Sequence, residues 1–384
     1  MSSWNCYKLG DVLDVRRGGS PRPINNYLTD EPEGLNWIKI SDASASDKYI
    51  YTTKQKIKPE GLHKTRFVEE GDFLLSNSMS FGRPYIMKTK GCIHDGWLVL
   101  KNKNDYELDK EFLYHLLCSP NLFDQFDSLA AGSTVRNLNI GLVSSVLIPV
   151  PPIKEQKQIV AILDKAFAAI DQAQANIQQN IQNTQDLFQS KLNQIFSQQG
   201  DGWEMKTWSE VLEIRSGKNQ RQVLDENGAY PIYGSAGKIM GYANDYLCVE
   251  GTTIIGRKGS INNPKLIAEK FWNVDTAFGL HSSDDLDNEF LYYFCLSYDF
   301  TQRDKGSGRP SLVKKDLLKM LMPIPSLKQQ KNTVKEVKQL NNKLCNLEKK
   351  YILKSDYLDE LKKSLLQKAF NGELTANKAL EEVL

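Results

Sequence analysis

The amino-acid sequence contains one pattern twice, and each copy ends in a long segment without glycine or proline. The segment from Gly132 reads GSTVRNLNIGLVSSVLIPVPPIKEQK, and the segment from Gly306 reads GSGRPSLVKKDLLKMLMPIPSLKQQK. An offset of 174 residues aligns the two segments, and the same offset still aligns Phe196 with Phe370. A repeat of such a long period indicates duplicated whole domains rather than a solenoid of short repeats.

The beginnings of the two copies also match, but at other offsets. Trp4 aligns with Trp203 at an offset of 199 residues, and Asp109 aligns with Asp287 at an offset of 178 residues. The falling offset places the difference in length in the middle of each copy. Similar ends and different middles predict one scaffold that carries two different recognition surfaces.

Short apolar runs bounded by glycine or proline predict strands in each globular part. They are GDFLLS (71–76), WLVL (97–100) and VLIPV (146–150) in the first copy, and TTIIG and KLIAE in the second. Apolar residues at helical spacing follow Phe112 and again Phe290. We therefore expect an α+β fold with two globular domains, each packed on a central mixed sheet. The predicted order is a domain over 1–150, a helix over 151–200, a domain over 201–325, and a helix with a C-terminal tail over 326–384.

The two segments without glycine or proline, 153–199 and 327–371, are far longer than an average globular helix. Apolar residues follow alternating steps of three and four along both, interrupted in the first by Gln174, Thr184 and Lys191, and this spacing predicts a left-handed coiled coil. The simplest arrangement is an antiparallel pair within one chain; the alternative is two amphipathic helices that dock separately. The predicted seam consists of Val160, Leu163, Phe167, Ile170, Ile177, Ile181 and Phe188 in the first segment, and Val337, Leu340, Leu344, Leu347, Tyr351, Leu358, Leu361 and Leu365 in the second.

Composition is that of an ordinary globular protein, with 40% hydrophobic and 25% charged residues in 384. The sequence has no apolar run long enough to cross a membrane and no signal-peptide core within 1–10, so we expect no membrane association. Its six cysteines form no C-x-x-C pair, which favours a reduced, cytoplasmic protein without structural zinc. The net charge is only +2, so a nucleic-acid partner would require positive charge focused on one face.

Motifs for nucleotide hydrolysis or metal chemistry are absent. The sequence has no Walker A loop, no G-x-G-x-x-G loop and no methyltransferase N/D-P-P-Y/F motif. Its four histidines share no metal-ligand spacing. His94 and Asp95 could form an acid–base pair, but a lone histidine beside an aspartate is more often structural. We therefore expect no catalytic residue and no cofactor in this chain.

Several segments concentrate arginine and lysine among small polar residues, in matching places of both copies. Arginine suits guanine edges and asparagine suits adenine, while glycine and serine let the backbone approach phosphates. Taken singly, each of these segments could equally be a solvated turn. The candidate DNA-binding residues are Arg16, Arg17, Arg22, Asn77, Ser78, Arg83 and Arg136 in the first copy, and Arg215, Lys218, Arg221, Arg257, Lys258, Ser260 and Arg309 in the second.

The whole chain resembles the specificity subunits of type I restriction–modification enzymes. The resemblance rests on the order of domain and helix, on PVPPIKEQKQIVAILD and PIPSLKQQ at the helix starts, and on KAFNGEL near the end. It implies that each globular domain is a target-recognition domain that reads one half of a split, asymmetric site in double-stranded DNA. It also implies that the coiled coil sets the spacer and docks two methyltransferase subunits. Such a subunit is non-catalytic. It directs adenine N6 methylation and, with restriction or motor subunits, DNA cleavage in host defence; S-adenosylmethionine, ATP and magnesium would bind those partners.

Two other classes remain as alternatives. The first is a coiled-coil scaffold whose two domains bind proteins. The second is a self-contained nuclease or methyltransferase, which the missing motifs disfavour. DNA binding by the chain with its partner subunits distinguishes the first alternative from a specificity subunit.

Overall fold

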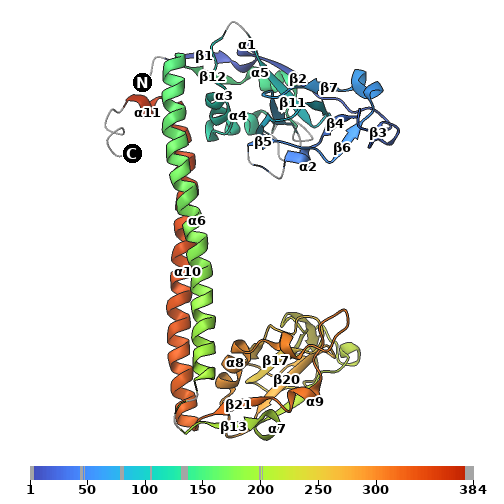
Figure 1. Ribbon diagram of the computed structural model, residues 1–384, viewed down its shortest axis with the longest axis vertical. Coiled ribbons are helices and arrows are strands. Elements are labelled where there is room, and N and C mark those ends of the chain that lie inside the picture. The colour runs from blue at the N-terminus through green and yellow to red at the C-terminus, as the bar shows by residue number, and fades with distance from the viewer. Residues whose placement is uncertain are drawn as a thin grey trace. The chain divides into compact units, whose positions relative to one another are not determined.

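The computed structural model describes residues 4–43, 46, 48–77, 82–103, 106–130, 137–198, 200 and 202–376. The chain divides into two compact units: unit 1 contains Met1–Ala175 and Lys354–Leu384, and unit 2 contains Asn176–Leu353. Each unit consists of a globular α+β part and one part of each of the two long helices (Figure 1). The predicted fold class is confirmed.

Unit 1 contains two five-stranded sheets and a two-stranded sheet. The first sheet has the order β2 (Leu13–Arg17), β11 (Trp97–Asn102), β8 (Phe73–Ser76), β9 (Pro84–Met87) and β5 (Tyr49–Ile50). The second has the order β3 (Leu28–Thr29), β6 (Gln55–Ile57), β4 (Leu35–Ile38), β10 (Gly91–Ile93) and β7 (Arg66–Val68). The antiparallel pair is β1 (Asn5–Lys8) with β12 (Leu147–Val150).

Short helices complete unit 1, and α3 and α4 pack on the first sheet. Asp109 caps α3 because its carboxylate accepts the backbone N–H groups of Glu111 and Phe112. The helices are α1 (Leu9–Val12), α2 (Ile40–Ala43), α3 (Lys110–Leu117), α4 (Pro120–Ala130), α5 (Ile140–Ser145) and α11 (Glu373–Ala376), with 3-10 turns at Ile24–Asn26 and Pro59–Lys64.

Unit 2 repeats this plan with fewer strands. Its four-stranded sheet has the order β14 (Leu212–Ser216), β20 (Ala277–Ser282), β17 (Thr252–Gly256) and β18 (Lys265–Ile267). Its three-stranded sheet has the order β16 (Ile239–Ala243), β15 (Tyr230–Tyr233) and β19 (Trp272–Asn273). The remaining elements are the pair β13 (Glu204–Thr207) and β21 (Leu321–Ile324), the helices α7 (Trp208–Val211), α8 (Asn288–Ser297) and α9 (Lys314–Leu317), and 3-10 turns at Gln220–Gln222 and Phe300–Arg303.

The predicted strands all overlap observed strands, but the prediction of one central sheet is wrong. Each globular part instead has two separate larger sheets. Periodicity identifies a strand from its own residues, whereas the choice of neighbouring strand depends on contacts far along the chain. The sequence pattern alone could not assign strands to sheets.

The long helices are α6 (Ile153–Ser197) and α10 (Leu327–Phe370). In unit 1, Ile159 near the start of α6 shares a core with Phe370 at the end of α10. In unit 2, Leu192 near the end of α6 shares a core with Val337 near the start of α10. The two helices therefore run antiparallel in each unit, as predicted.

Most of the predicted seam faces inward, but two leucines do not. The buried members are Leu163, Ile170, Val337 and Leu344, and the half-buried members are Val160, Phe167, Ile177, Ile181, Phe188, Leu340, Tyr351, Leu358 and Leu365. Leu347 is 38% exposed and Leu361 is 45% exposed, so their assignment to the seam is wrong. The inward face runs instead through Glu348, Ser355 and Lys362, which are half-buried polar residues.

The reason is visible at Lys362 in unit 1. Its ammonium donates to Asp171 at 2.5 Å and to Gln174 at 3.3 Å, both on α6. Polar side chains therefore occupy one of the two inward heptad positions of α10 from Glu348 to Lys362. A search that follows apolar residues alone moves to the neighbouring leucine.

A buried glutamine near the start of each long helix joins that helix to its globular part. Gln156 and Gln330, which the 174-residue offset aligns, are both fully buried. The side-chain oxygen of each accepts the backbone N–H of the residue that caps an earlier helix, Asp109 of α3 at 2.8 Å or Asp287 of α8 at 2.7 Å. The amide nitrogen of each donates to two backbone oxygens, those of Glu107 and Pro151 in unit 1 and those of Asp285 and Pro325 in unit 2. The repeated Pro-x-Pro and glutamine pattern is therefore a structural joint.

Candidate nucleic-acid interface

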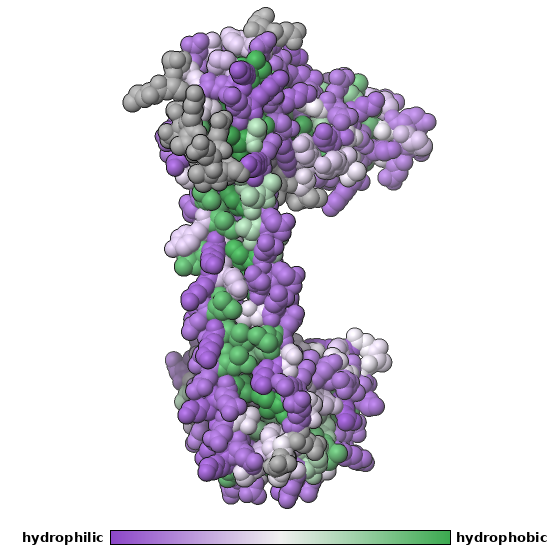
Figure 2. All heavy atoms as spheres, turned by 60° about the vertical axis from the view of Figure 1, so that its left-hand side comes forward, coloured by the Kyte–Doolittle hydropathy of each residue, from purple (hydrophilic) through white to green (hydrophobic). Residues whose placement is uncertain are grey.

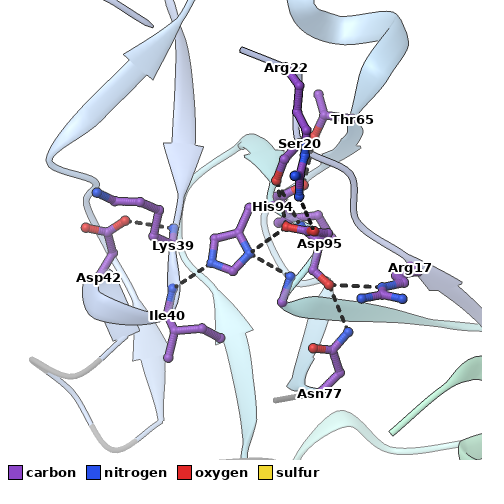
Figure 3. A network of polar contacts seen from close by, with 12 residues as sticks. Arg17, Ser20, Arg22, Lys39, Ile40, Asp42, Thr65, Asn77, His94 and Asp95 are labelled. Carbon is purple, nitrogen blue, oxygen red and sulfur yellow. Dashed lines mark hydrogen bonds and ion pairs between the residues drawn. The ribbon is translucent and has the colours of Figure 1, made fainter. Parts of the chain in front are cut away.

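Three predicted DNA-binding residues of unit 1 meet at the turn 94–96, which links β10 to β11 (Figure 3). Arg17 Nε and Asn77 Nδ2 both donate to the backbone oxygen of Asp95, at 3.0 and 2.9 Å. The guanidinium of Arg22 lies 3.5 Å from the Asp95 carboxylate. These residues are far apart in the sequence, so the tertiary structure gathers them around Asp95.

The Asp95 carboxylate is a fixed anion at this surface. Ser20 Oγ donates to its Oδ1 atom at 2.7 Å, and this hydrogen bond is the main reason that the pKa of Asp95 lies below its ordinary value. Its partner Arg22 is 81% exposed, and Asp95 itself is 44% exposed. An exposed ion pair adds little stability, about 1 kcal/mol at most. Its consequence here is the orientation of Arg22.

His94 supports the same turn as a neutral side chain. Burial is the main reason that its pKa is lowered. Its Nδ1 atom accepts the backbone N–H of Gly96 at 2.6 Å, and its Nε2 atom lies 3.4 Å from the backbone nitrogen of Ile40. The ring is therefore occupied in shaping the turn, in keeping with a structural role for His94 beside Asp95.

A hollow of about 850 Å³ opens beside this turn. Apolar side chains and cationic or amide side chains together line this hollow. Within the rim, Lys39 donates to Gln55 at 2.8 Å. The lining residues are Ser20, Pro21, Arg22, Pro23, Ile24, Asn25, Leu28, Trp37, Lys39, Gln55, His94 and Asp95.

The other candidates in unit 1 occupy different environments. Asn77 is fully buried and holds the turn, so the prediction that its amide faces DNA is wrong for this structure. Arg16 pairs with Asp14 at 2.6 Å, and Arg83 is exposed with its guanidinium 5.8 Å from the ring centre of Tyr85. Ser78 and Arg136 lie outside the described residues.

In unit 2 the structure brings together two predicted loops, 257–260 and 306–311. The backbone N–H of Gly259 donates to Pro310 at 2.8 Å, and Lys258 forms a β-bridge with Ser311. Gly259 has a φ of +87°, and a Cβ atom there would lie 2.9 Å from the Arg309 guanidinium. Glycine thus allows Arg309 to lie across the loop that carries Arg257, Lys258 and Ser260.

Arg257 is half-buried and donates to the backbone oxygen of Asp275 at 3.2 Å, while Lys258, Ser260 and Arg309 are exposed. Asp304 holds the second loop because its carboxylate accepts the backbone N–H groups of Gly306 and Ser311, each at 2.8 Å. The result is a supported loop pair with cationic side chains at its surface.

The three remaining DNA-binding candidates of unit 2 differ in how far their side chains are exposed and paired. Arg215 bonds to Glu213 on its own strand and donates to the backbone oxygen of Leu247 at 3.0 Å. Lys218 and Arg221 are exposed. Arg215 lies within β14.

The two units present these side chains from one backbone frame. The turn 94–96 of unit 1 corresponds to the turn 274–276 of unit 2, and Asn77 corresponds to Arg257. Both residues make the same pair of backbone hydrogen bonds: Asn77 with Gly96 and Leu138 at 3.0 and 2.9 Å, and Arg257 with Thr276 and Leu312, both at 2.8 Å. Gly18 and Gly217 also correspond. The backbone N–H of Gly18 donates to Trp97, the first residue of β11, and that of Gly217 donates to Ala277, the first residue of β20.

The sequence analysis overlooked Asp95 and Ser20 as members of this surface. A usable signal was present, since an aspartate precedes the same strand in both copies, in HDGWLVL and in VDTAFGL.

The described residues contain no group of three or more histidine, cysteine, aspartate or glutamate side chains arranged to hold a metal ion. Within the same residues, no helix is both long enough and apolar enough to span a bilayer.

The model of one protein family, the type I restriction modification DNA specificity domain, matches residues 1–183 and 200–354. The chain is 21% identical to the MjaVIII specificity subunit of Methanocaldococcus jannaschii, over 97% of this chain and 93% of the relative. It is 23% identical to the EcoBI specificity subunit of Escherichia coli, over 97% and 87% of the two chains.

Two solved structures have a similar fold. One chain comes from a study of complex assembly and conformational transition in a type I R-M system, with a TM-score of 0.75, 19% identity, and coverage of 96% of this chain and 98% of that chain. The other is the HsdS subunit from Thermoanaerobacter tengcongensis, with a TM-score of 0.58, 20% identity, and coverage of 96% and 97%.

Proposed function

This chain belongs to the type I restriction modification DNA specificity family, and we propose that its two globular parts each read one half of a bipartite DNA site. It is the specificity subunit of a type I restriction–modification system, with DNA and the other subunits of that system as partners. The observation that supports one half-site for each unit is the set of equivalent backbone hydrogen bonds in the two units. In unit 1, Arg17 and Arg22 contact the turn 94–96, and in unit 2 Arg257 contacts the corresponding turn 274–276.

The two halves of the site are expected to differ in sequence. Unit 1 has a buried asparagine, Asn77, where unit 2 has a half-buried arginine, Arg257. Unit 1 also has a hollow beside its turn, whereas in unit 2 the backbone N–H groups of Arg257 and Lys258 donate to Thr276 of the turn. Two unlike reading surfaces select an asymmetric site, because identical surfaces on a two-fold frame would read a palindrome.

The long helices are proposed to set the spacer and to dock the partner subunits. At 1.5 Å per residue, the 45 residues of α6 span roughly 65–70 Å. Hydrophobic side chains lie on the exposed surface of the paired helices (Figure 2), and on α10 they include Ile352, Leu353 and Leu361. Exposed apolar groups of this kind mark protein interaction surfaces. Two methyltransferase subunits and the restriction or motor subunits are the proposed occupants.

The chemistry is proposed to belong to the partners. We propose that this chain is non-catalytic and that adenine N6 methylation and cleavage use S-adenosylmethionine, ATP and magnesium bound elsewhere in the complex. His94 supports this assignment, because its ring nitrogen is bonded to the backbone of its own turn. The cysteines also support action in the reducing cytoplasm, since all six are free thiols.

Single substitutions test whether the two surfaces read separate halves. Arg83→Ala in unit 1 and Arg257→Ala in unit 2 are each expected to weaken specific binding by about 1–3 kcal/mol if the side chain contacts a base. Gel shift of the complex with its methyltransferase subunits measures affinity, and methylome sequencing of the host identifies the half-site affected.

Leu224→Ala is a matched control, because Leu224 is an exposed side chain of unit 2 outside the loop pair. The proposal predicts a change confined to one half-site for each arginine and no change for the control. If both arginine variants bind and direct methylation like the parent, these two loops do not read DNA. If the complex binds no DNA in a sequence-specific manner, the alternative of a protein-binding scaffold is favoured.

A further inference from the structure

We propose that Asp95 is a positioning residue that holds Arg22 in the orientation for reading a base, and so sets how strictly unit 1 discriminates at one base pair. This inference rests on the DNA-reading function proposed above. It concerns a residue that the sequence analysis did not assign to the interface.

The structure holds Asp95 from several sides (Figure 3). Its backbone oxygen accepts hydrogen bonds from Arg17 and Asn77, and Ser20 occupies its Oδ1 atom. The remaining carboxylate oxygen, Oδ2, lies 3.5 Å from the Arg22 guanidinium. Asp95 is therefore a fixed acceptor for the exposed side chain of Arg22.

Arg22 is expected to need such an acceptor in order to read sequence. An exposed arginine without an oriented partner binds phosphate, and phosphate contacts carry no sequence information. A guanidinium presents five N–H groups in a rigid fork, so an ion pair at one nitrogen limits the directions in which the others can point. Bidentate recognition of guanine O6 and N7 depends on that direction. The carboxylate also repels nearby phosphate, which further disfavours a non-specific contact.

Unit 2 contains a matched control at the corresponding turn. Asp275 is exposed and occupies the place of Asp95. The contact from Arg257 is to the backbone oxygen of Asp275, at 3.2 Å. Replacing the carboxylate of Asp275 therefore leaves that contact in place, whereas replacing the carboxylate of Asp95 removes the partner of Arg22.

The test uses the complete complex of this chain with its partner subunits. Methylome sequencing of the parent first defines the site, and binding is then measured on that duplex and on duplexes changed at one base pair at a time. Asp95→Asn keeps an oxygen for Ser20 and removes the charge. We expect discrimination at one base pair of one half-site to fall on the order of ten-fold. Non-specific DNA should bind more tightly, because a negative charge has been removed.

Asp275→Asn should leave discrimination unchanged in both half-sites. Ser20→Ala, which frees the carboxylate but retains its charge, should give a smaller loss at the same base pair as Asp95→Asn. If Asp95 acts through Arg22, adding Asp95→Asn to Arg22→Ala should change discrimination no further.

Two results would overturn the inference while the proposed function stands. One is a loss of discrimination in Arg22→Ala with none in Asp95→Asn or Ser20→Ala. The other is an even loss of affinity at all base pairs in Asp95→Asn, accompanied by a lower midpoint of thermal unfolding, which indicates a purely structural role. If Arg22→Ala and Arg83→Ala both leave each half-site unchanged, the proposed reading surface of unit 1 fails, and this inference fails with it.

Discussion

The globular parts of units 1 and 2 agree in their backbone hydrogen bonds and differ in the side chains that these bonds support. Asn77 and Arg257 make equivalent backbone bonds, and both side chains donate to the backbone oxygen of the aspartate in the turn, but Asn77 is fully buried and Arg257 is half-buried. The carboxylate of Asp95 also contacts Arg22. Because backbone atoms form the shared frame, side chains on it can change without loss of the fold. Such a frame allows two unlike surfaces to arise from one duplicated domain.

Exchange of a whole globular part is the strongest test of this comparison. We expect that replacing residues 4–149 with the corresponding domain of another family member changes one half-site completely and leaves the other intact. The junction is favourable because β1 and β12, near the two ends of the exchanged segment, pair with each other. Methylome sequencing provides the readout, and a hybrid that altered both halves would contradict independent reading.

The glutamine joints should be equivalent in the two units. Gln156→Leu and Gln330→Leu each leave one backbone N–H group and two backbone oxygens without their side-chain partner, and one of these oxygens, that of Pro151 or Pro325, is buried. We expect each to lower the free energy of unfolding by about 2–3 kcal/mol. Denaturant unfolding followed by circular dichroism measures the change, and Gln158→Leu, at an exposed position on α6, is the control. A large loss for only one of the two would show that the joints are not equivalent.

A change in the length of the long helices should alter the length of the spacer and leave the sequences of both half-sites unchanged. Four residues inserted after Gln199, which lies outside the described residues, would extend a helix by about 6 Å if they continue α6. We expect unchanged half-sites and a spacer longer by one or two base pairs, because B-DNA rises about 3.4 Å per base pair. Methylome sequencing that found the original spacer would rule out the helices as the measure of this distance.

As the pH falls, α3 of unit 1 should lose stability before α8 of unit 2. His115 in α3 is buried beside Asp164, Lys48 and Glu111, and burial is the main reason that its pKa is lowered. A histidine with a lowered pKa in the folded state stabilises the protein above its unfolded pKa of about 6.5, and that stability is lost as the pH falls. The 178-residue offset places Tyr293 at the corresponding position of α8.

Hydrogen exchange at pH 7 and pH 5 can measure this difference. We expect amide protection in α3 to fall more than that in α8 over this interval. His115→Phe should make the response of α3 resemble that of α8. Equal loss of protection in both helices of the parent protein would contradict a specific effect of His115.

The sequence by itself determined the duplication, the α+β class, the positions of the strands and the bounds of the long helices. These features are local or repeat at a fixed offset, so periodicity, glycine and proline reveal them. Only the tertiary structure decided which strands share a sheet and that Glu348, Ser355 and Lys362 face inward in place of Leu347 and Leu361. It also decided that Arg17, Arg22 and Asn77 meet at Asp95. A hydrogen bond or ion pair between residues tens of positions apart depends on how the intervening chain folds, and no local pattern records it.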